Sequence, residues 1–185
     1  MMRFFLKHLS VRLSLLSLNN WLSLNKMNRS DSVSFDRAKR DLVKHNLESH
    51  ILVFEESSAT VSEAALAVGV SEGEIAKTLS FYVDDKPILI VAAGDVKIDN
   101  AKYRHFFGKK AKMIPFEEVE EVIGHKVGGV CPFGVNPGVD VFLDISLKVY
   151  EHVYPACGTG NSAVKLSIKE LEDSSNSVSY THLRA

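Results

Sequence analysis

The chain has 185 residues, and 45% of them are hydrophobic, which suffices for one domain with a buried core. No apolar run approaches the ~20 residues that span a bilayer, and two cysteines give neither a disulfide framework nor a metal-binding spacing. These features exclude membrane-spanning, disulfide-rich and zinc-ribbon classes. We expect no cofactor, no metal and no membrane partner, and we expect the cytoplasm as a reducing compartment.

Charge is unevenly distributed along the chain. The formal net charge is −1, but residues 1–26 carry four basic residues and no acid, and residues 174–185 carry one basic residue and no acid. Setting these five cations aside leaves 17 basic and 23 acidic residues, a net charge of −6, for residues 27–173. An acidic domain disfavours a broad nucleic-acid interface and limits RNA contact to a local basic patch.

Both ends of the chain are excluded from the predicted domain. The head is basic and rich in Leu and Ser, but it lacks the cleavage site of a signal peptide. We interpret residues 1–26 as translated upstream sequence before a start at Met27, with a mitochondrial-type presequence as the alternative. Residues 174–185 look like a translated sequencing or cloning remnant, which leaves residues 27–173 as the domain.

Helical periodicity, capping patterns and turn residues predict alternating helices and strands between these ends. Helices are expected over residues 35–47, 61–67, 99–107 and 115–123 and from residue 167, with a short helix over 71–77 that ends at Lys77. Strands are expected over 51–54, 78–83, 88–93, 111–114, 139–144, 149–154 and 163–166. Strands 78–83 and 88–93 form a hairpin around a turn at 84–87, and a second turn lies at 158–161. This order argues for one α/β domain with a mixed sheet.

A glycine-rich loop occupies residues 124–135, between two apolar segments. It contains Gly124, Gly128, Gly129 and Gly134 together with Pro132. Glycines permit positive φ and close approach of a ligand to the peptide plane, while proline fixes one φ and removes one donor. The loop alone leaves two interpretations open: a structural bend between strands, or a loop that binds a ligand.

Three separated motifs carry a resemblance to a known family. They are IAKTL at 75–79, GGVCPFG at 128–134 and CGTGN at 157–161. In this order they resemble the YbaK/EbsC family, which includes the prolyl-tRNA synthetase-associated editing domains, over residues 31–172. The resemblance implies a mixed, partly barrel-like β-sheet flanked by helices. It also implies an aminoacyl-tRNA deacylase, which hydrolyses the ester bond of a mischarged tRNA.

Lys77, Gly128 and Gly129 are the catalytic candidates that the resemblance implies. In the family, the lysine matching Lys77 is required for activity, and we expect it to hold a phosphate of the terminal adenosine or the ester carbonyl. The alternative from the residues alone is an exposed edge lysine. Gly128 and Gly129 would line the acyl pocket, where main-chain groups position water or the ester. An aminoacyl ester is already activated, so no protein nucleophile is needed.

Further residues are expected to bind the substrate. They are Thr60, Asp95, His125, Cys131, Pro132, Phe133, Gly134, Gly158, Gly160 and Asn161. His125 either shuttles a proton or only fixes the loop, and we favour the second role. Asp95 either caps or braces a turn. Cys131 is a nucleophile in principle, but a small buried or pocket-lining residue is the interpretation we favour.

Residues 158–163 formally match the Gly-x-Gly-x-x-Ala pattern of dinucleotide-binding loops. Only 22 residues follow Ala163, too few for the rest of such a unit, so this interpretation is rejected. In relatives that act on cysteinyl-tRNA an Asp aligns with Ala163, which argues against cysteine specificity here. From the start of the early helix, Ser57, Ser58 and Val61 are expected to face the site together with Thr60.

Two functions are consistent with these features. The first is a free-standing, trans-editing hydrolase that removes a small, wrongly attached amino acid from tRNA and so serves the fidelity of protein biosynthesis. Its partners would be the acceptor end of tRNA and, as a second candidate, an aminoacyl-tRNA synthetase. The alternative is a non-catalytic module that binds a tRNA end, a nucleotide or a synthetase, which the acidic domain and the lack of a visible nucleophile both fit.

Overall fold

The computed structural model describes residues 29–185, so the interpretation of residues 1–26 lies outside the described residues. The α-helices are α2 (Arg29–Lys44), α3 (Val61–Val68), α4 (Asn100–Phe107), α5 (Phe116–Ile123) and α6 (Ile168–Ser175), with 3-10 helices at Glu48–His50, Glu72–Glu74 and Ile145–Val149. The strands are β1 (Ile51–Val53), β2 (Ile75–Val83), β3 (Lys86–Ala93), β4 (Lys112–Met113), β5 (Asp140–Asp144), β6 (His152–Pro155), β7 (Ser162–Val164), β8 (Leu166–Ser167) and β9 (Ser179–Thr181).

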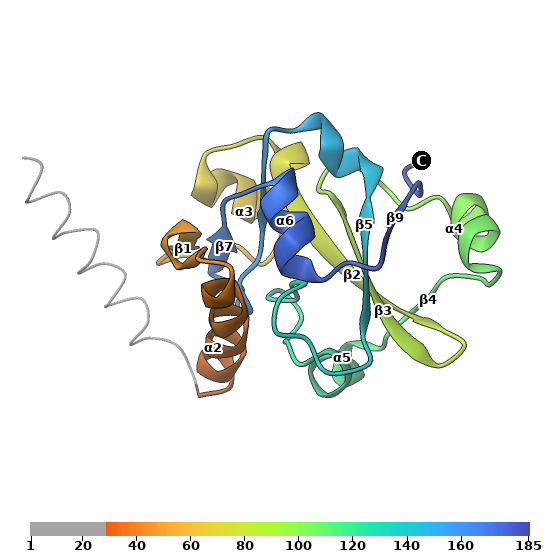
Figure 1. The fold of residues 1–185 in the computed structure, drawn as a ribbon, viewed down its shortest axis with the longest axis horizontal. Helices are drawn as coiled ribbons and strands as arrows, with labels where there is room; N and C mark the ends of the chain where they lie inside the picture. The colour runs from red at the N-terminus through yellow and green to blue at the C-terminus, as the bar shows by residue number, and fades with distance from the viewer. Residues whose placement is uncertain (1–28) are drawn as a thin grey trace, which may run out of the picture.

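One mixed sheet organises the domain. Its strand order is β8-β6-β2-β3-β5-β9, and β4 adds to β2 at the side away from β3. The β2–β3 and β6–β8 pairs are antiparallel, whereas β2–β6, β3–β5 and β5–β9 are parallel. Helices surround this curled sheet, with α4 and α2 at opposite ends (Figure 1). The predicted fold class, a single α/β domain with a mixed, partly barrel-like sheet, is confirmed.

The β2–β3 hairpin is the centre of the sheet. Its two turn residues, Asp84 and Asp85, have φ values of 48° and 62°. Two successive left-handed residues form the tight turn whose twist matches antiparallel strands. The pairing then runs without interruption from Val83↔Lys86 to Ala76↔Ala93. β3 is buried from Ile88 onward because β2 and β5 pair with its two edges and apolar side chains cover its faces.

The capping patterns read from the sequence form as predicted. Reciprocal capping boxes join Thr60 to Glu63, Ser71 to Glu74 and Ser167 to Glu170. The Asp99 side chain accepts hydrogen bonds from the N–H groups of residues 101 and 102 at the start of α4. Each box satisfies main-chain donors that have no partner inside the helix, so these helices begin at fixed residues.

Three boundaries differ from the prediction. β2 begins at Ile75, because the preceding helix ends at Glu74, so Lys77 lies inside the strand instead of at its entry. The strand predicted over 149–154 begins only at His152, because residues 145–149 form a 3-10 helix that Asp144 caps. The strand predicted over 163–166 is two strands, and the Lys165 N–H between them donates to the His50 carbonyl.

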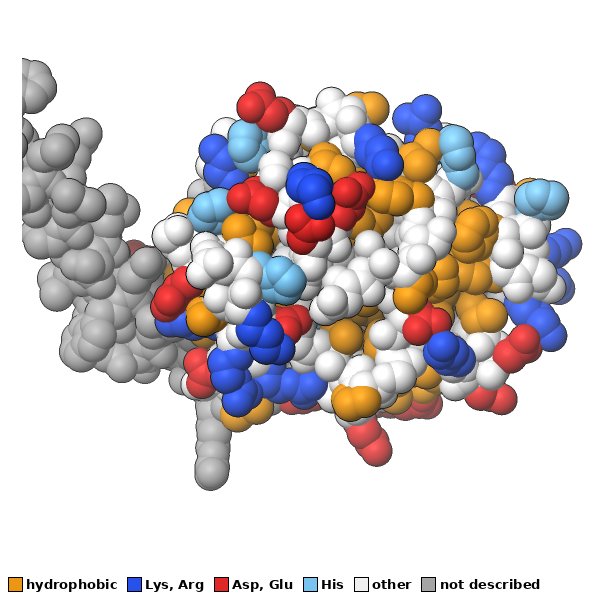
Figure 2. Space-filling model, in the orientation of Figure 1, with side chains coloured by type: hydrophobic (Ala, Val, Ile, Leu, Met, Phe, Trp, Pro, Cys, Tyr) orange, Lys and Arg blue, Asp and Glu red, His pale blue; other side chains and the backbone are white. Residues whose placement is uncertain are grey.

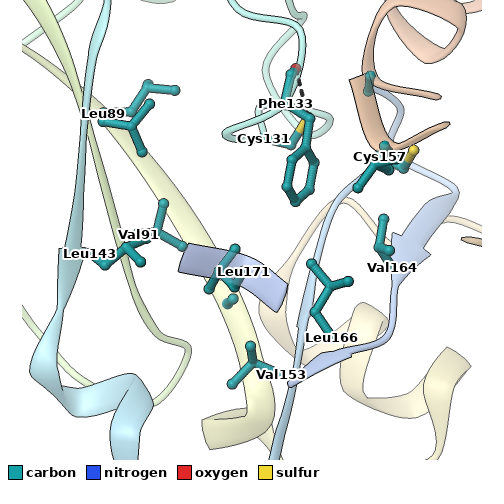
Figure 3. Close-up of a cluster of buried hydrophobic side chains, with 14 of the residues drawn as sticks. Leu89, Val91, Cys131, Phe133, Leu143, Val153, Cys157, Val164, Leu166 and Leu171 are labelled. Carbon is teal, nitrogen blue, oxygen red and sulfur yellow. Dashed lines mark hydrogen bonds between the residues drawn. The ribbon is translucent and has the colours of Figure 1, made fainter. Parts of the chain in front are cut away.

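The largest buried cluster lies between the sheet and α2, α5 and α6. Figure 3 shows part of it, including Phe133, Cys131 and Cys157 among aliphatic side chains of β3, β5, β6 and α6. A second cluster under α4 contains Phe81 and Tyr103, and a third under α3 contains Ile75 and Tyr154. Among the described residues, no helix is long and apolar enough to cross a membrane.

The C-terminal residues pack on the domain. β9 pairs with β5, Leu183 is 1% exposed, and its N–H donates to the buried Asp144 carboxylate at 2.8 Å. Leaving residues 174–185 out of the fold therefore missed one edge strand. The interpretation of this segment as a non-native remnant concerns its origin and stays a prediction.

Candidate functional site

A cavity of about 540 Å³ lies beside β2. Its position follows from the sheet, because the edge of β2 away from β3 is paired with β6 only at residues 75–76 and with β4 only at residues 81–82. The lining comes from β2, the loop before α3 and α3 itself, β4 and α5, the glycine-rich loop, and β6 and β7: residues 58–61, 64, 75–80, 113, 114, 116, 119, 127, 128, 130, 154, 156, 162 and 163. The cavity is therefore built at a gap in the hydrogen-bonded edge of the central strand.

Lys77 lines this cavity from the interior of β2. Its ammonium is not free: Nζ donates to the Gly94 carbonyl at 2.9 Å and to the Val96 carbonyl. Burial lowers the pKa of Lys77, while the negative charge of Asp95 raises it and Lys97 lowers it further. An ammonium has three N–H donors, so one remains for an oxygen of a ligand.

Asp95 lies outside the cavity, in the turn that follows β3, and it is exposed. Its charge acts on Lys77 and on the phenol of Tyr150, whose pKa is raised by burial and then by Asp95. In the structure Asp95 therefore acts on the lysine electrostatically and does not line the cavity wall.

The loop before α3 supplies two hydroxyls with different surroundings. Thr60 lines the cavity, but its hydroxyl already accepts from the Glu63 N–H at 3.2 Å as the helix cap. Ser58 lines the cavity, is 8% exposed, and its Oγ has no partner among the described residues. Ser57 does not line the cavity, and its hydroxyl donates to Glu63 at 2.8 Å. Ser58 is thus the side chain of this loop that is left to meet a ligand.

Five glycine-loop and turn residues form the wall behind Ser58. Gly128 lines the cavity, with φ +92°. Gly129 packs behind it: a Cβ there would lie 2.6 Å from the Gly158 carbonyl oxygen. The Gly160 carbonyl accepts from the Ser58 N–H at 2.6 Å, and the Asn161 side chain donates to the Phe54 carbonyl at 3.1 Å. Of the five, only Gly128 reaches the cavity, and the other four hold its wall.

The other half of the glycine-rich loop faces the core. His125, Cys131 and Phe133 are each 0% exposed and do not line the cavity. His125 Nε2 lies 2.7 Å from the Phe133 carbonyl oxygen and 3.6 Å from Cys131 Sγ. Burial acts to lower the pKa of His125, but Cys131 and the Phe133 carbonyl outweigh it, so the net shift is upward. These three residues fix the loop from inside.

Pro132 and Gly134 line a different groove. It is open and carries Arg37, Arg40 and Lys44 of α2. The Gly134 N–H donates to the Asp41 carboxylate at 3.0 Å. The loop therefore separates the cavity at Gly128 from a basic groove on α2.

Several lining residues were not singled out from the sequence. They include Thr78, Ser80 and Ser162, and the apolar rim residues Met113 and Phe116, which are 59% and 74% exposed. Among the described residues, Lys77 and Tyr154 are the only titratable side chains in the lining, and no carboxylate, imidazole or thiol is part of it. Within residues 29–185, no cluster of three or more His, Cys, Asp or Glu side chains could hold a metal ion. The sequence gives one signal for this rim, a Phe that directly follows Pro115 at the start of a predicted helix.

The fold and this cavity define a class: a single α/β domain whose central strand opens at one edge into a pocket with one lysine. The sequence model of the aminoacyl-tRNA editing domain family matches residues 55–174. This chain belongs to that family, so the family identified from the three motifs is confirmed.

Individual relatives agree with this assignment. The uncharacterized protein YwhH of Bacillus subtilis (strain 168) is 50% identical over 142 residues, which are 76% of this chain and 90% of that protein. The proline–tRNA ligase of Bacillus licheniformis is 24% identical over 131 residues, 69% of this chain but only 22% of the ligase. A crystal structure of a protein proposed to be a trans-editing enzyme for prolyl tRNA synthetase superposes with a TM-score of 0.75 at 27% identity, over 86% of this chain and 99% of that chain.

Proposed function

We propose that this protein is a free-standing hydrolase that deacylates mischarged aminoacyl-tRNA. The observation that carries the proposal is the cavity with Lys77 and Gly128 in its wall, in a chain of the aminoacyl-tRNA editing domain family. The cavity volume, about 540 Å³, suits an aminoacyl group together with part of the terminal nucleoside.

The lining indicates how a small amino acid is selected. Most lining side chains are apolar, and the few polar ones are hydroxyls and one ammonium. An apolar pocket distinguishes amino acids that differ by one methylene by only about 1 to 3 kcal/mol, which is why errors of synthetases in this class need a separate hydrolytic step. Size exclusion in this cavity would then reject amino acids larger than the substrate.

Lys77 is proposed to hold and polarise the substrate. Its remaining N–H is directed to the ester carbonyl or to a phosphate oxygen of the terminal nucleotide. Water adds to the ester carbonyl carbon, the bond from that carbon to the ribose oxygen breaks, and the ribose oxygen leaves with a proton from the water. Because the ester is activated, positioning and polarisation carry this reaction without a protein nucleophile.

The basic helix α2 is proposed as the place where the RNA backbone is held. Arg37, Lys39, Arg40 and Lys44 lie within about two turns of this helix, and Figure 2 shows Lys and Arg side chains gathered over it. Lys39 and Lys44 form ion pairs with Glu48 and Asp41 in the structure. The Lys39–Glu48 pair is exposed on both sides and the Lys44 side chain is exposed, so these ammonium groups can exchange their carboxylates for phosphates, and α2 supplies the local patch that an acidic domain requires.

The test is deacylation by the full chain of tRNAs charged with alanine, serine, threonine, cysteine or proline. We expect multiple-turnover release of one amino acid, and a loss of about 100-fold in Lys77→Ala, which removes one donor to the developing charge. Lys110→Ala is the matched control, because Lys110 is exposed, lies outside the cavity and is not among the charges that act on Lys77. Equal rates in Lys77→Ala and wild type would overturn the role of Lys77.

A non-catalytic binding module is the second candidate, and one observation favours it. The lining holds no general base, since Lys77 donates to two carbonyls and Tyr154 is the only other titratable group. A module of this kind would retain aminoacyl-tRNA binding without releasing any amino acid of the panel. Turnover beyond one equivalent excludes this candidate.

A further inference from the structure

The cavity exposes a gap in the main-chain hydrogen bonding of β2. Along one edge β2 pairs continuously with β3, but on the other edge the pairing stops after Ala76 and resumes at Phe81. Just before it resumes, the Ser80 carbonyl accepts from the Ile114 N–H at 3.1 Å. No strand of the described chain fills the interval between these points.

Thr78 is the residue whose main chain faces this gap. In an antiparallel strand the main-chain groups of successive residues point to opposite edges. Since the Ser80 carbonyl points away from β3, the N–H and C=O of Thr78, two residues earlier, point the same way. No strand pairs with β2 at Thr78 on this edge, and among residues 29–185 neither group bonds to a turn, a loop or a side chain; the buried Thr78 hydroxyl also has no partner. All three groups belong to a residue that lines the cavity.

Thr78 is half-buried and lines the cavity, so its unpaired groups are open to a ligand that supplies the partners. A buried donor or acceptor without a partner costs about 1 to 3 kcal/mol, so such groups are rarely left unmatched in a folded protein. An N–H and a C=O on one residue are matched by a molecule that carries an acceptor and a donor about one residue apart. That is the pattern of a second β-strand one residue long.

The aminoacyl group of an aminoacyl-tRNA has this pattern. Its α-amine is a donor, its ester carbonyl is an acceptor, and one carbon atom joins them as in a peptide residue. The cavity lining contains no carboxylate to receive the α-ammonium, so a neutral oxygen must accept from it. The Thr78 carbonyl is the main-chain oxygen that the strand geometry directs into the cavity.

We infer that the open edge of β2 at Thr78 binds the aminoacyl group in the manner of a β-strand, an assignment that rests on the proposed hydrolase function. The Thr78 carbonyl accepts from the α-amine, and the Thr78 N–H donates to the ester carbonyl oxygen. When water adds to the carbonyl carbon, this oxygen becomes an oxyanion and the bond from the Thr78 N–H strengthens. The site thus recognises an α-amino acid by its backbone and leaves its side chain to the rest of the cavity.

The first test removes the amine from the substrate. For the amino acid of the panel that wild type releases fastest, the deaminated acyl-tRNA is compared with it: propionyl-tRNA for alanyl-tRNA, or 3-hydroxypropionyl-tRNA for seryl-tRNA. Both rates are divided by the uncatalysed rates, because the amine also activates the ester chemically. We expect the deaminated substrate to lose at least tenfold in this ratio, and an unchanged ratio would overturn the inference.

The second test removes the donor from the protein. Replacing threonine 78 by its α-hydroxy acid converts the N–H to an ester oxygen and keeps the side chain; we expect about a 100-fold fall in kcat, the usual effect of one oxyanion donor. Urea unfolding of this variant beside wild type is the control, because a fall in kcat counts only where the variant remains folded. Full kcat in the main-chain variant would overturn the inference while the proposed function stands, whereas failure of wild type on the whole panel would overturn both.

Discussion

The glycine-rich loop and the open edge of β2 line the same cavity but use their residues differently. The loop has many residues that stand out in the sequence, and most of them pack: His125, Cys131 and Phe133 are fully buried, and Gly129 lies against the Gly158 main chain. The β2 edge has one conspicuous residue, Lys77, and the polar groups of Thr78 at the gap have no partner among the described residues. In the glycine-rich loop the unusual residue types serve packing, whereas at the β2 edge the unpaired main chain is available to a ligand.

This difference separates two reasons for an unusual sequence. A loop with four glycines and a proline is required where main chains pass within van der Waals distance of each other, as Gly129 and Gly158 do. A strand edge needs no unusual residue to present an N–H and a C=O, because every residue except proline has both. Stability variants should therefore act strongly on the buried side of the loop and weakly at the cavity rim.

The largest effect is expected for Phe133→Ala. The ring of Phe133 is fully buried in the main core cluster, so its removal should lower the free energy of unfolding by about 4 kcal/mol. Phe116→Ala is the matched control, because Phe116 is 74% exposed at the cavity rim and its loss should cost under about 0.5 kcal/mol. Urea unfolding of both variants measures the difference. Equal losses would show that the loop is not anchored by its buried side.

A smaller effect is expected for Gly129→Ala. The new Cβ would lie 2.6 Å from main-chain atoms of Gly158 and Thr159, which cannot rotate away, so we expect a loss of about 2 to 3 kcal/mol. Gly138→Ala is the control: Gly138 has φ +89° but open space around it, so only the left-handed backbone costs energy, about 1 kcal/mol. Thermal and urea unfolding compare the two. A milder effect at Gly129 than at Gly138 would contradict the close packing of the two loops.

The sequence predicted local structure well where a side chain and its main-chain partner are neighbours. The three capping boxes, the Asp99 cap and the central hairpin depend on contacts within a few residues, and all of them form. The role of the side chains in the 124–135 loop depends on which segments lie behind it, and periodicity does not contain that information. Spacing along the chain could not show that His125 faces inward while Gly128 faces the cavity.

The open edge of β2 could not be predicted from the sequence, for a related reason. Whether Thr78 has a main-chain partner depends on where β6 ends and β4 begins, and these strands are separated from β2 by long stretches of chain. Lys77 was identified only through the family motif, and its two carbonyl partners come from the turn after β3. Resemblance therefore singled out Lys77, whereas the tertiary structure determined which polar groups beside it have partners.

The smallest effect, and one that isolates the cost of an unpaired group, is expected for Tyr103→Phe. Tyr103, the buried residue of α4, packs between Phe81 and Phe107 away from the cavity, and its buried hydroxyl has no partner among the described residues. Removing this hydroxyl should raise the free energy of unfolding by about 1 kcal/mol at neutral pH, because the folded state then no longer buries a hydroxyl that has lost its water and gained no hydrogen bond. If Tyr103→Phe instead destabilises the protein by that amount, the hydroxyl has a partner, and the same argument for Thr78 would weaken.

The pH dependence of the stability difference between wild type and Tyr103→Phe tests the burial of this hydroxyl independently. Burial raises the pKa of Tyr103 to about 12, whereas an unfolded tyrosine titrates near 10. Below pH 10 both states hold the proton, so the hydroxyl's titration contributes nothing to stability. As pH rises from 10 to 12 the unfolded state loses its proton first, which lowers the stability of the wild type but not of Tyr103→Phe. The advantage of the variant in urea unfolding should therefore grow over this interval, and an advantage that stays constant would mean that the phenol of Tyr103 is in contact with water.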